Sequence, residues 1–401
     1  MESFVVDAST KDELNVLIIG DPHVVDSAIK EIEELTQKLS LMIEKINTGV
    51  LSFEELNSYF DGKDIPEDRQ KLDKFDIAII MGDALDRHEK CTVYSHKKAL
   101  DLFDSISKYM PLFVIIGNHD RPYNSDFLSD YHFFNGLKDK KNLYIIDKVK
   151  IYTFVKQPSG VPNIIDSTNL PEIRNAPHSI LFVPYVPNGR FMEAIGTVII
   201  PDITKITCIC AHQEIYNCRY NGIVSKNGDK LDHDKLPLII SGHIHEYGKL
   251  KGVTYVGSSR QITRVESHDK TVSIFKFGLH GIEERRVNMN LIKKINMVIK
   301  VSQLHTLVVP SNCLLYLIIE GTKTEIKSLK KLATFKPIIE NKNIKVYYRT
   351  DLSEDTIVDE DQKARSKTGG TFIEKLKSRI CNNKEQFELF QELFENQNTG
   401  K

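Results

Sequence analysis

Five short segments of the sequence carry side chains that bind metal ions or transfer protons in other proteins, and each directly follows an apolar run. The segments are GDPH at 20–23, GD at 82–83, GNHD at 117–120, AH at 211–212 and GHIH at 242–245. They supply Asp21, His23, Asp83, Asn118, His119, His212, His243 and His245. GDPH and GD alone are more typical of turns, and an isolated His212 is more typical of a core histidine, whereas GNHD and GHIH are more specific. Together, carboxylates and neutral imidazoles suit Mn²⁺, Fe²⁺ or Zn²⁺, so their combination predicts a metal site.

The spacing of these residues fits two ions held close together. Two divalent ions about 4 Å apart need an anionic ligand that bridges them, and Asp83 is the natural candidate. In D-x-H and H-x-H one residue separates the two ligands, so on an extended segment both side chains point to the same side. Asn118 offers a carbonyl oxygen. The adjacent His119 cannot readily reach the same ion, so we expect it to perform acid–base work.

The apolar runs that precede these segments predict the scaffold. In the first third of the chain, short apolar runs alternate with amphipathic patterns, which indicates buried strands and helices in turn. We expect strands at 14–19, 75–81 and 112–116, helices at 26–46 and 94–107, and an insertion at about 47–73. The carboxyl ends of parallel strands are where sites assemble in α/β folds.

The following part of the chain, from about 143 to 284, contains mostly short strand-like runs. The runs are LYII, KIYTF, SILFV, TVII, ITCIC, LPLII, GVTYVGS and TVSIFKF. They predict a second, more antiparallel sheet. The fold class expected for residues 1–288 is therefore α/β, a two-sheet sandwich flanked by helices.

The composition is that of an ordinary globular chain. Its 401 residues are more than a single core usually fills, and its formal net charge of −1 gives no argument for a polyanionic partner. No apolar run approaches ~18 residues, and the first residues lack the pattern of a secretory signal. Six cysteines are scattered, and Cys208 and Cys210 alternate as reduced core residues would. We expect an intracellular protein, in the cytoplasm or nucleus, without a membrane span.

A basic segment stands out against this neutral background. Between residues 285 and 349 the chain has 13 Lys and Arg, three Glu and no Asp, a local balance of +10. A strand at 313–319, a helix at 323–332 and a strand at 344–348 predict a small β-α-β domain over 289–350. Duplex DNA carries one negative charge every ~1.7 Å, so a protein that binds it needs a high local concentration of Lys and Arg. The alternative is a solvated basic surface without function.

Two further segments carry unexplained apolar residues. An acidic linker at 351–370 leads to 371–401, where two short amphipathic helices are expected; they would either bind a partner or fold back onto their own domain. After GNHD, apolar residues recur at helical spacing, and either a homodimer contact or core packing explains them. These residues are Phe127, Leu128, Tyr131, Phe134 and Leu137.

The order D-x-H, GD, GNH, H, GHxH resembles that of the calcineurin-like metallophosphoesterases over roughly residues 14–280. Within that superfamily the chain is most similar to the SbcD-type DNA recombination and repair nuclease subunit, which partners an SMC-like ABC ATPase. Three features carry this finer resemblance: GNHDRP at 117–122, TYVGSSRQITRVES at 254–267 and the basic domain.

The resemblance implies roles for single residues. It implies two divalent ions, with Mn²⁺ expected for both. One would be held by Asp21, His23, Asp83 and His245, and the second by Asp83, Asn118, His212 and His243. His119 would protonate the leaving oxygen. The basic domain would cap DNA through the helix that carries Lys327, Lys330 and Lys331. The C-terminal helices would bind the coiled coil of an SbcC-type ATPase, and the chain would form a homodimer.

One residue departs from the nuclease pattern. Such nucleases usually have a histidine three residues after the bridging aspartate, whereas this chain has Asp86, with His88 nearby. The segment GDALDR is closer to the GDxxDR of protein phosphatases. The interpretation is therefore a two-metal DNA exonuclease and endonuclease, with a protein phosphatase or small-molecule phosphodiesterase as the alternative. A non-catalytic scaffold is a third hypothesis, although such relatives commonly lose ligands and this chain retains all of them.

Overall fold

The computed structural model describes residues 13–350 except 51–72, 89, 158–161, 171–177, 201, 221, 279–280 and 312. Most of the expected insertion, the linker and the C-terminal helices therefore lie outside the described residues. The chain divides into two compact units. The larger comprises Met1–Met297, Val308–Tyr316 and Lys342–Lys345, and the smaller comprises Val298–Leu307, Leu317–Asn341 and Val346–Lys401.

The first sheet of the larger unit has six strands in the order β15-β14-β1-β2-β3-β4. Their bounds are β1 (Leu14–Ile19), β2 (Ile77–Ile80), β3 (Leu112–Ile115), β4 (Leu143–Ile146), β14 (Thr271–Gly278) and β15 (Gly281–Asn288). β1 to β4 pair in parallel, whereas β14 pairs antiparallel with β1 and β15. The runs LYII and TVSIFKF thus belong to the first sheet, and their expected place in the second sheet was wrong.

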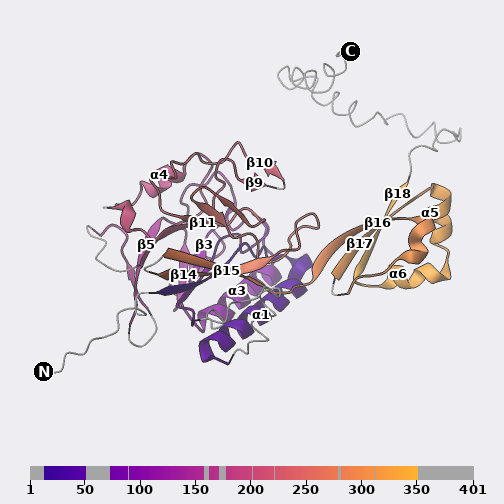
Figure 1. The fold of residues 1–401 in the computed structure, drawn as a ribbon, viewed down its shortest axis with the longest axis horizontal. Helices are drawn as coiled ribbons and strands as arrows, with labels where there is room; N and C mark the ends of the chain where they lie inside the picture. The colour runs from indigo at the N-terminus through magenta and orange to yellow at the C-terminus, as the bar shows by residue number, and fades with distance from the viewer. Residues whose placement is uncertain are drawn as a thin grey trace, which may run out of the picture. The chain divides into compact units, whose positions relative to one another are not determined.

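Two long helices cover one face of this sheet. A short η2 (Asp26–Ala28) leads into α1 (Ile29–Thr48), and α3 (Val93–Ser107) packs beside it (Figure 1). α1 buries residues spaced three or four apart, as an amphipathic helix does: Ile32, Leu35, Leu39, Met42, Ile43 and Ile46. These side chains share one apolar cluster with residues from β1, β2 and β3. Both helices were predicted from the sequence at nearly the observed bounds.

The second sheet has seven strands in the order β12-β13-β11-β8-β7-β5-β6. Their bounds are β5 (Lys150–Val155), β6 (Asn163–Asp166), β7 (His178–Val183), β8 (Cys208–Ala211), β11 (Ile239–Ser241), β12 (Gly248–Leu250) and β13 (Val253–Tyr255). The sheet is mixed: β7, β8, β11 and β13 run parallel, whereas β12 pairs antiparallel with β13, and β5 pairs antiparallel with β7 and β6. A separate hairpin pairs β9 (Arg219–Tyr220) with β10 (Ile223–Val224).

The run TVII at 197–200 does not form the expected strand. It follows the short helix α4 (Phe191–Ile195) and precedes η5 (Ile203–Lys205). Val198 and Ile200 instead pack at the edge of the apolar cluster on the outer side of the second sheet. These apolar residues therefore pack a loop against the sheet. In sequence, a short apolar run of this kind cannot be distinguished from a short buried strand by its pattern alone.

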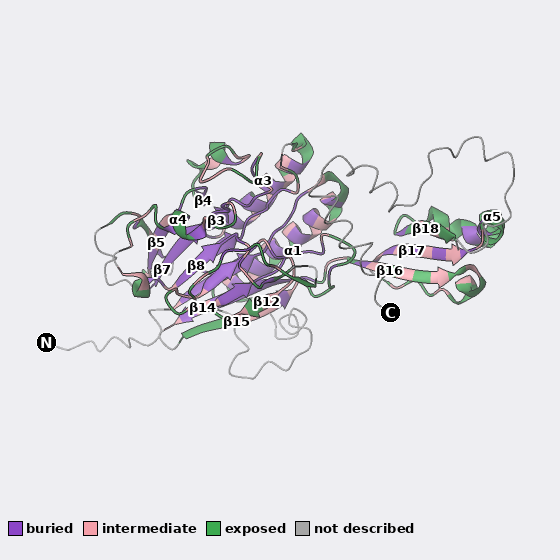
Figure 2. Ribbon diagram, turned by 90° about the horizontal axis from the view of Figure 1, so that it is seen from above, coloured by how far each residue is buried: buried purple, intermediate pink, exposed green. Residues whose placement is uncertain are grey.

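The two sheets pack face to face. Alternate residues of β1, such as Val16 and Ile18, join Phe182, Cys208 and Cys210 of the second sheet in one buried cluster. The intervening residues of β1 face the helices instead. Figure 2 shows most strands of this unit as buried, whereas the edge strand β15 is mostly exposed or half-buried. The chain is thus an α/β protein whose mixed sheets form the expected sandwich, and no described helix is long and apolar enough to cross a membrane.

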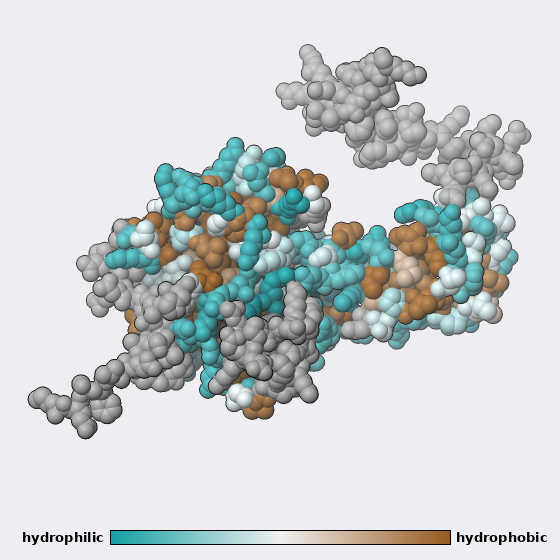
Figure 3. Space-filling model, viewed as in Figure 1, coloured by the Kyte–Doolittle hydropathy of each residue, from teal (hydrophilic) through white to brown (hydrophobic). Residues whose placement is uncertain are grey.

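The C-terminal part of the described chain forms a three-stranded sheet, β16-β17-β18, with short helices. Its elements are β16 (Lys293–Lys300), η6 (Val301–Thr306), β17 (Cys313–Gly321), α5 (Lys323–Leu329), η7 (Ala333–Phe335), α6 (Lys336–Glu340) and β18 (Ile344–Thr350). α5 begins with a capping box between Thr322 and Glu325. Figure 3 shows hydrophobic residues on the visible side of this part of the chain. Val298 and Tyr347 are among its exposed hydrophobic residues.

Two expectations for this part of the chain were incomplete. β16 was not expected, although Ile295, Met297 and Ile299 are spaced two apart and are less exposed than Asn296 and Val298 between them, as in a strand with one covered face. The helix ends at Leu329, three residues earlier than expected.

In the larger unit, the apolar residues after GNHD form no long helix, only η4 (Asn135–Leu137).

Candidate metal centre

The candidate ligands stand where strands end. Asp21 and Asp83 follow β1 and β2, Asn118 follows β3, and His212 and His243 follow β8 and β11. Because these strands are parallel within their sheets, their carboxyl ends lie at one edge of the sandwich. Segments up to 222 residues apart in sequence meet there, as shown by the contact between residues His23 and His245.

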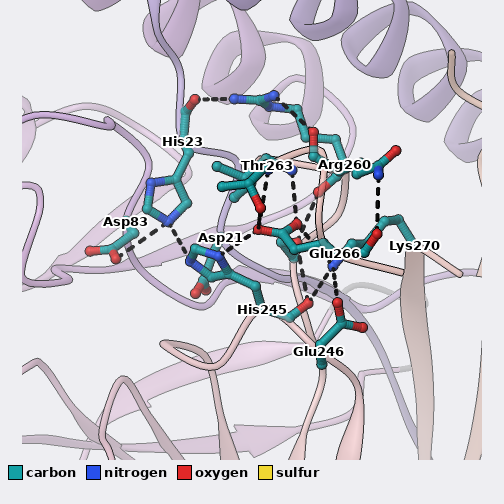
Figure 4. Close-up of polar contacts among 12 residues, drawn as sticks. Asp21, His23, Asp83, His245, Glu246, Arg260, Thr263, Glu266 and Lys270 are labelled. Carbon is teal, nitrogen blue, oxygen red and sulfur yellow. Dashed lines mark hydrogen bonds and ion pairs between the residues drawn. The ribbon is translucent and has the colours of Figure 1, made fainter. Parts of the chain in front are cut away.

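The first cluster, defined here as Asp21, His23 and His245, offers three ligand atoms within 4.8 Å of one another. The Nε2 atoms of the two histidines are 3.0 Å apart and face each other (Figure 4). Asp21 Oδ1 is buried and has no hydrogen-bond partner. A buried carboxylate oxygen beside two converging imidazole nitrogens is a donor set that a divalent cation satisfies.

The second cluster consists of Asp83, Asn118, His212 and His243. Asn118 Oδ1 lies 3.1 Å from His212 Nε2 and 3.0 Å from His243 Nδ1. His212 Nε2 also lies 3.3 Å from Asp83 Oδ2. The Nδ1 of His212 donates to the Met81 carbonyl at 2.8 Å, which directs Nε2 toward the cluster.

Asp83 lies between the first cluster and the other residues of the second. Its Oδ2 is 3.3 Å from His212 Nε2 and 3.5 Å from His23 Nε2. Asp83 can therefore complete a ligand group with His212 and His243, and another with His23 and His119. A shared carboxylate between two histidine groups fits a dinuclear metal centre.

His119 occupies the more accessible side of Asp83. Its side chain is 29% exposed, and its Nε2 is 4.0 Å from Asp83 Oδ2. Its Nδ1 donates to the carbonyl of Asp86 at 2.6 Å, which fixes the ring orientation. The ring of His88 stacks on it, with centroids 4.3 Å apart. His119 is thus oriented by its surroundings with Nε2 toward the centre.

Three of the ligand residues have an unusual backbone. His23, Asp83 and His243 have φ angles of 45°, 45° and 74°, in the left-handed region that residues with side chains seldom occupy. Gly82 has a φ of 110°, and a Cβ there would lie 2.3 Å from His212 Nδ1. A Cβ on Gly117 would lie 2.2 Å from Asp83 Oδ1. The backbone is therefore packed against the ligand side chains.

The buried charges perturb one another strongly. Burial disfavours ionisation of Asp83, but His212 and His23 hold its pKa well below its usual range. Burial likewise disfavours protonation of His212, but Asp83 and Asp21 raise its pKa to about 9. Burial and the charge of His212 lower the pKa of His243 to about 3. Without metal, the second cluster therefore holds a carboxylate, a protonated His212 and a neutral His243.

All eight residues expected at the metal site converge on this edge of the sandwich. The three lysines expected to bind DNA lie in the smaller unit, where each is exposed. Lys327 lies on α5, Lys330 ends it with its Nζ 4.2 Å from the ring centroid of Tyr348, and Lys331 follows.

Three residues of the site were missed in the sequence. Asp120 is buried and accepts hydrogen bonds from the backbone of Leu85 and of Gly117, each at 3.0 Å, so it ties two ligand segments together. Burial and the charge of Asp83 raise the pKa of Asp120 to about 6. Glu266 and Arg260 contact the first cluster from the segment 254–267. That segment was noted only as a family resemblance, and nothing in its pattern separates a buried ligand-orienting carboxylate from an exposed one.

Asp86, the residue that departs from the nuclease pattern, lies beside the first cluster. Its Oδ1 is 3.3 Å from His23 Nδ1, and its carbonyl orients His119. His88 donates from Nδ1 to the carbonyl of Asn118 at 2.8 Å. Both residues thus contact members of the centre.

Comparison with known proteins agrees with this geometry. A family model described as calcineurin-like phosphoesterase matches residues 14–247. A protein of Invertebrate iridescent virus 6 named "Putative phosphoesterase 244L" is 32% identical over 327 residues, covering 80% of this chain and 98% of the relative. A protein of Invertebrate iridescent virus 3 named "Putative phosphoesterase 078R" is 30% identical over 285 residues, covering 71% of this chain and 68% of the relative.

Proposed function

The chain belongs to the calcineurin-like phosphoesterase family and is a metal-dependent phosphoesterase, and we propose that its substrate is DNA. It acts as an exonuclease and endonuclease of a recombination or double-strand-break repair complex, with Mn²⁺ as the metal. The observation that carries the proposal is the +10 balance of residues 285–349, which follow directly on the phosphoesterase domain. A polyanion is the partner that such a concentration of charge favours.

The chemistry follows from the two clusters. Two bound ions would supply an activated water and neutralise charge on the phosphoryl oxygens. Asp21, His23 and His245 would hold one ion, Asn118, His212 and His243 would hold the other, and Asp83 would contribute to both ligand sets. These residues would place the ions at the edge of the sandwich.

His119 is the general acid in this proposal. Its Nδ1 proton is engaged by the Asp86 carbonyl, so the proton that it can deliver is on Nε2, on the side of Asp83. Delivery to the departing oxygen completes cleavage of the ester bond. The stacked His88 lies next to this atom and supports the ring from one face.

The basic surface of the smaller unit is assigned to the DNA backbone. Lys327, Lys330 and Lys331 are exposed, and changing all three to Glu should weaken duplex binding and reduce its salt dependence by about three phosphate contacts. The assay is cleavage and binding of labelled linear duplex with Mn²⁺, beside hydrolysis of bis-p-nitrophenyl phosphate, which should not change. Equal duplex affinity in both proteins would refute the role of this surface.

A matched charge change controls for net charge. It places three Glu on exposed positions of the larger unit, namely Lys205, Lys235 and Lys251. This control variant has the same overall charge as the α5 variant. Duplex affinity should therefore fall much less in the control, and similar losses in both would indicate a general electrostatic effect.

A second candidate is a protein phosphatase or small-molecule phosphodiesterase. The observation that favours it is Asp86, which lies 3.3 Å from His23 where the nucleases usually have a histidine. Comparing Mn²⁺-dependent turnover of p-nitrophenyl phosphate, a phosphopeptide and linear duplex separates the two candidates. Cleavage of the monoesters without any nicking or shortening of DNA would replace the nuclease by this alternative.

Two interactions are proposed with the nuclease function. The first is an SMC-like ABC ATPase bound through residues 371–401, which lie outside the described residues; deletion of 366–401 should preserve metal binding and abolish co-purification. The second is a homodimer formed near Tyr131, which is 75% exposed, whereas Phe134 of the same segment is fully buried. A monomeric mass by sedimentation at micromolar concentration would refute the dimer.

A further inference from the structure

A loop formed by residues 258–270, here called the orienting loop, contacts both histidines of the first cluster (Figure 4). On the His245 side, Glu266 Oε1 lies 3.1 Å from His245 Nδ1, and the Glu266 side chain is 1% exposed. The carboxylate of Glu266 therefore accepts a hydrogen bond from Nδ1 of His245.

Glu266 is itself held in place. Its carboxylate accepts from the backbone of Ile262 at 2.9 Å and of Thr263 at 3.2 Å, and it pairs with Lys270 at 3.1 Å. Lys270 also donates to the carbonyl of His245 at 2.7 Å. These contacts leave the carboxylate one position, and that position determines which nitrogen of His245 carries the proton.

On the His23 side, the orienting loop contributes Arg260. This guanidinium is buried and donates from Nε to the Pro22 carbonyl at 2.7 Å and from Nη2 to the His23 carbonyl. Its Nη1 pairs with Glu31 of α1 at 3.1 Å. The same loop therefore fixes the backbone of one histidine and the ring of the other, and their Nε2 atoms meet.

His212 of the second cluster has a different partner behind its ring. Its Nδ1 donates to the neutral carbonyl of Met81 at 2.8 Å, and the nearest carboxylate oxygen, Asp21 Oδ1, is 3.9 Å away, beyond hydrogen-bond distance. A carboxylate behind an imidazole fixes its tautomer and increases its basicity as a ligand, and loss of such a partner weakens metal binding about 10–100-fold. The two ion positions thus differ in the hydrogen-bond partner of their histidines, which is the Glu266 carboxylate for His245 and the Met81 carbonyl for His212.

We propose that Glu266 is a positioning residue that sets the affinity of the first ion, held by Asp21, His23 and His245, independently of the second. It keeps the Nδ1 of His245 protonated and turns Nε2 toward His23. The proposal rests on the dimetal centre of the proposed function and not on DNA as the substrate. Its test therefore measures metal binding, and a failure of the DNA proposal would leave the result unaffected.

The experiment titrates metal-free full-length protein with Mn²⁺ by calorimetry and follows the bound ions by electron paramagnetic resonance. In Glu266→Ala we expect the first ion to bind about 10–100-fold more weakly and the second within about threefold of wild type. At one equivalent per subunit the spectrum should be that of isolated Mn²⁺ rather than of a coupled pair. Glu266→Gln, which keeps an acceptor oxygen without the charge, should lose about tenfold.

A purely structural role for Glu266 predicts a different pattern. Thr263→Val removes the hydroxyl that donates to Glu266 at 3.2 Å but leaves His245 untouched, so it is the matched control and should bind both ions as wild type does. Equal weakening of both ions, unchanged binding of the first ion, or the same loss in Thr263→Val would overturn the proposal. If Glu266→Ala does not fold by circular dichroism, the selective loss in Glu266→Gln decides.

Discussion

The protonated state of His212 predicts how metal binding depends on pH. In the metal-free protein its pKa is about 9, whereas an exposed histidine titrates near 6.5. At pH 7 about 99% of molecules therefore carry a proton on the nitrogen that must bind the ion. Displacing that proton lowers the affinity about 100-fold, or about 2.7 kcal/mol, and the affinity should rise at least about tenfold per pH unit up to pH 9.

The stability of the metal-free protein should change in the opposite direction. A raised histidine pKa stabilises the fold fully below about pH 6.5, and this contribution is lost as pH rises through about 9. The shift corresponds to a loss on the order of 3 kcal/mol in the free energy of unfolding across that window. Metal-loaded protein should lack this loss, because the ion occupies the nitrogen in place of the proton.

The assay is calorimetric titration of Mn²⁺ at several pH values, each in two buffers with different ionisation enthalpies. The difference between buffers counts the protons released. At pH 7 we expect about one proton from His212, with a further part from His245, whose pKa its carboxylate neighbours also raise despite burial. His243 should release none because its pKa is about 3. An affinity independent of pH between 6.5 and 9, or binding without proton release, would refute the reasoning.

The remaining predictions concern single substitutions at the centre. Asp83→Asn should abolish activity and lose at least one ion by metal analysis, while its thermal unfolding stays cooperative because the apolar clusters of the sandwich are untouched. His119→Asn should retain both ions and lose turnover about 10²–10⁴-fold; an ion lost from this variant would contradict its assignment as the acid. Gly82→Ala should lose metal and stability together, since its Cβ would lie 2.3 Å from His212 Nδ1.

The sequence was informative about the centre because its ligands follow strands directly. A buried strand and a ligand are neighbours in the chain, with a glycine between them before Asp83 and an alanine before His212, so the apolar run predicts where these side chains must lie. The partners of each strand were less predictable. LYII and TVSIFKF read as strands, but which sheet they join depends on pairings between distant segments, such as that of Val16 with Phe275.

Residues that act behind the ligands were predicted least well. Asp120 and Glu266 resemble surface carboxylates in sequence, and only the fold shows that both are buried and accept backbone hydrogen bonds. Their roles depend on contacts made across 35 and 21 residues respectively. A local sequence pattern cannot contain such information. The candidate metal ligands, in contrast, each lie in a short segment that directly follows an apolar strand.

The strained backbone of the centre explains why the fold can hold the ligands ready before an ion binds. Left-handed conformations at His23, Asp83 and His243 cost on the order of 1–3 kcal/mol each and persist only where surrounding contacts impose them. Those contacts are visible: the His23 backbone donates to the Asp83 carbonyl at 2.9 Å, and the His243 backbone donates to Asp21 at 2.7 Å. Each strained residue is therefore fixed by another residue of the centre. An arriving ion meets side chains whose directions the sandwich has already set, so little ordering cost is left to subtract from its binding free energy.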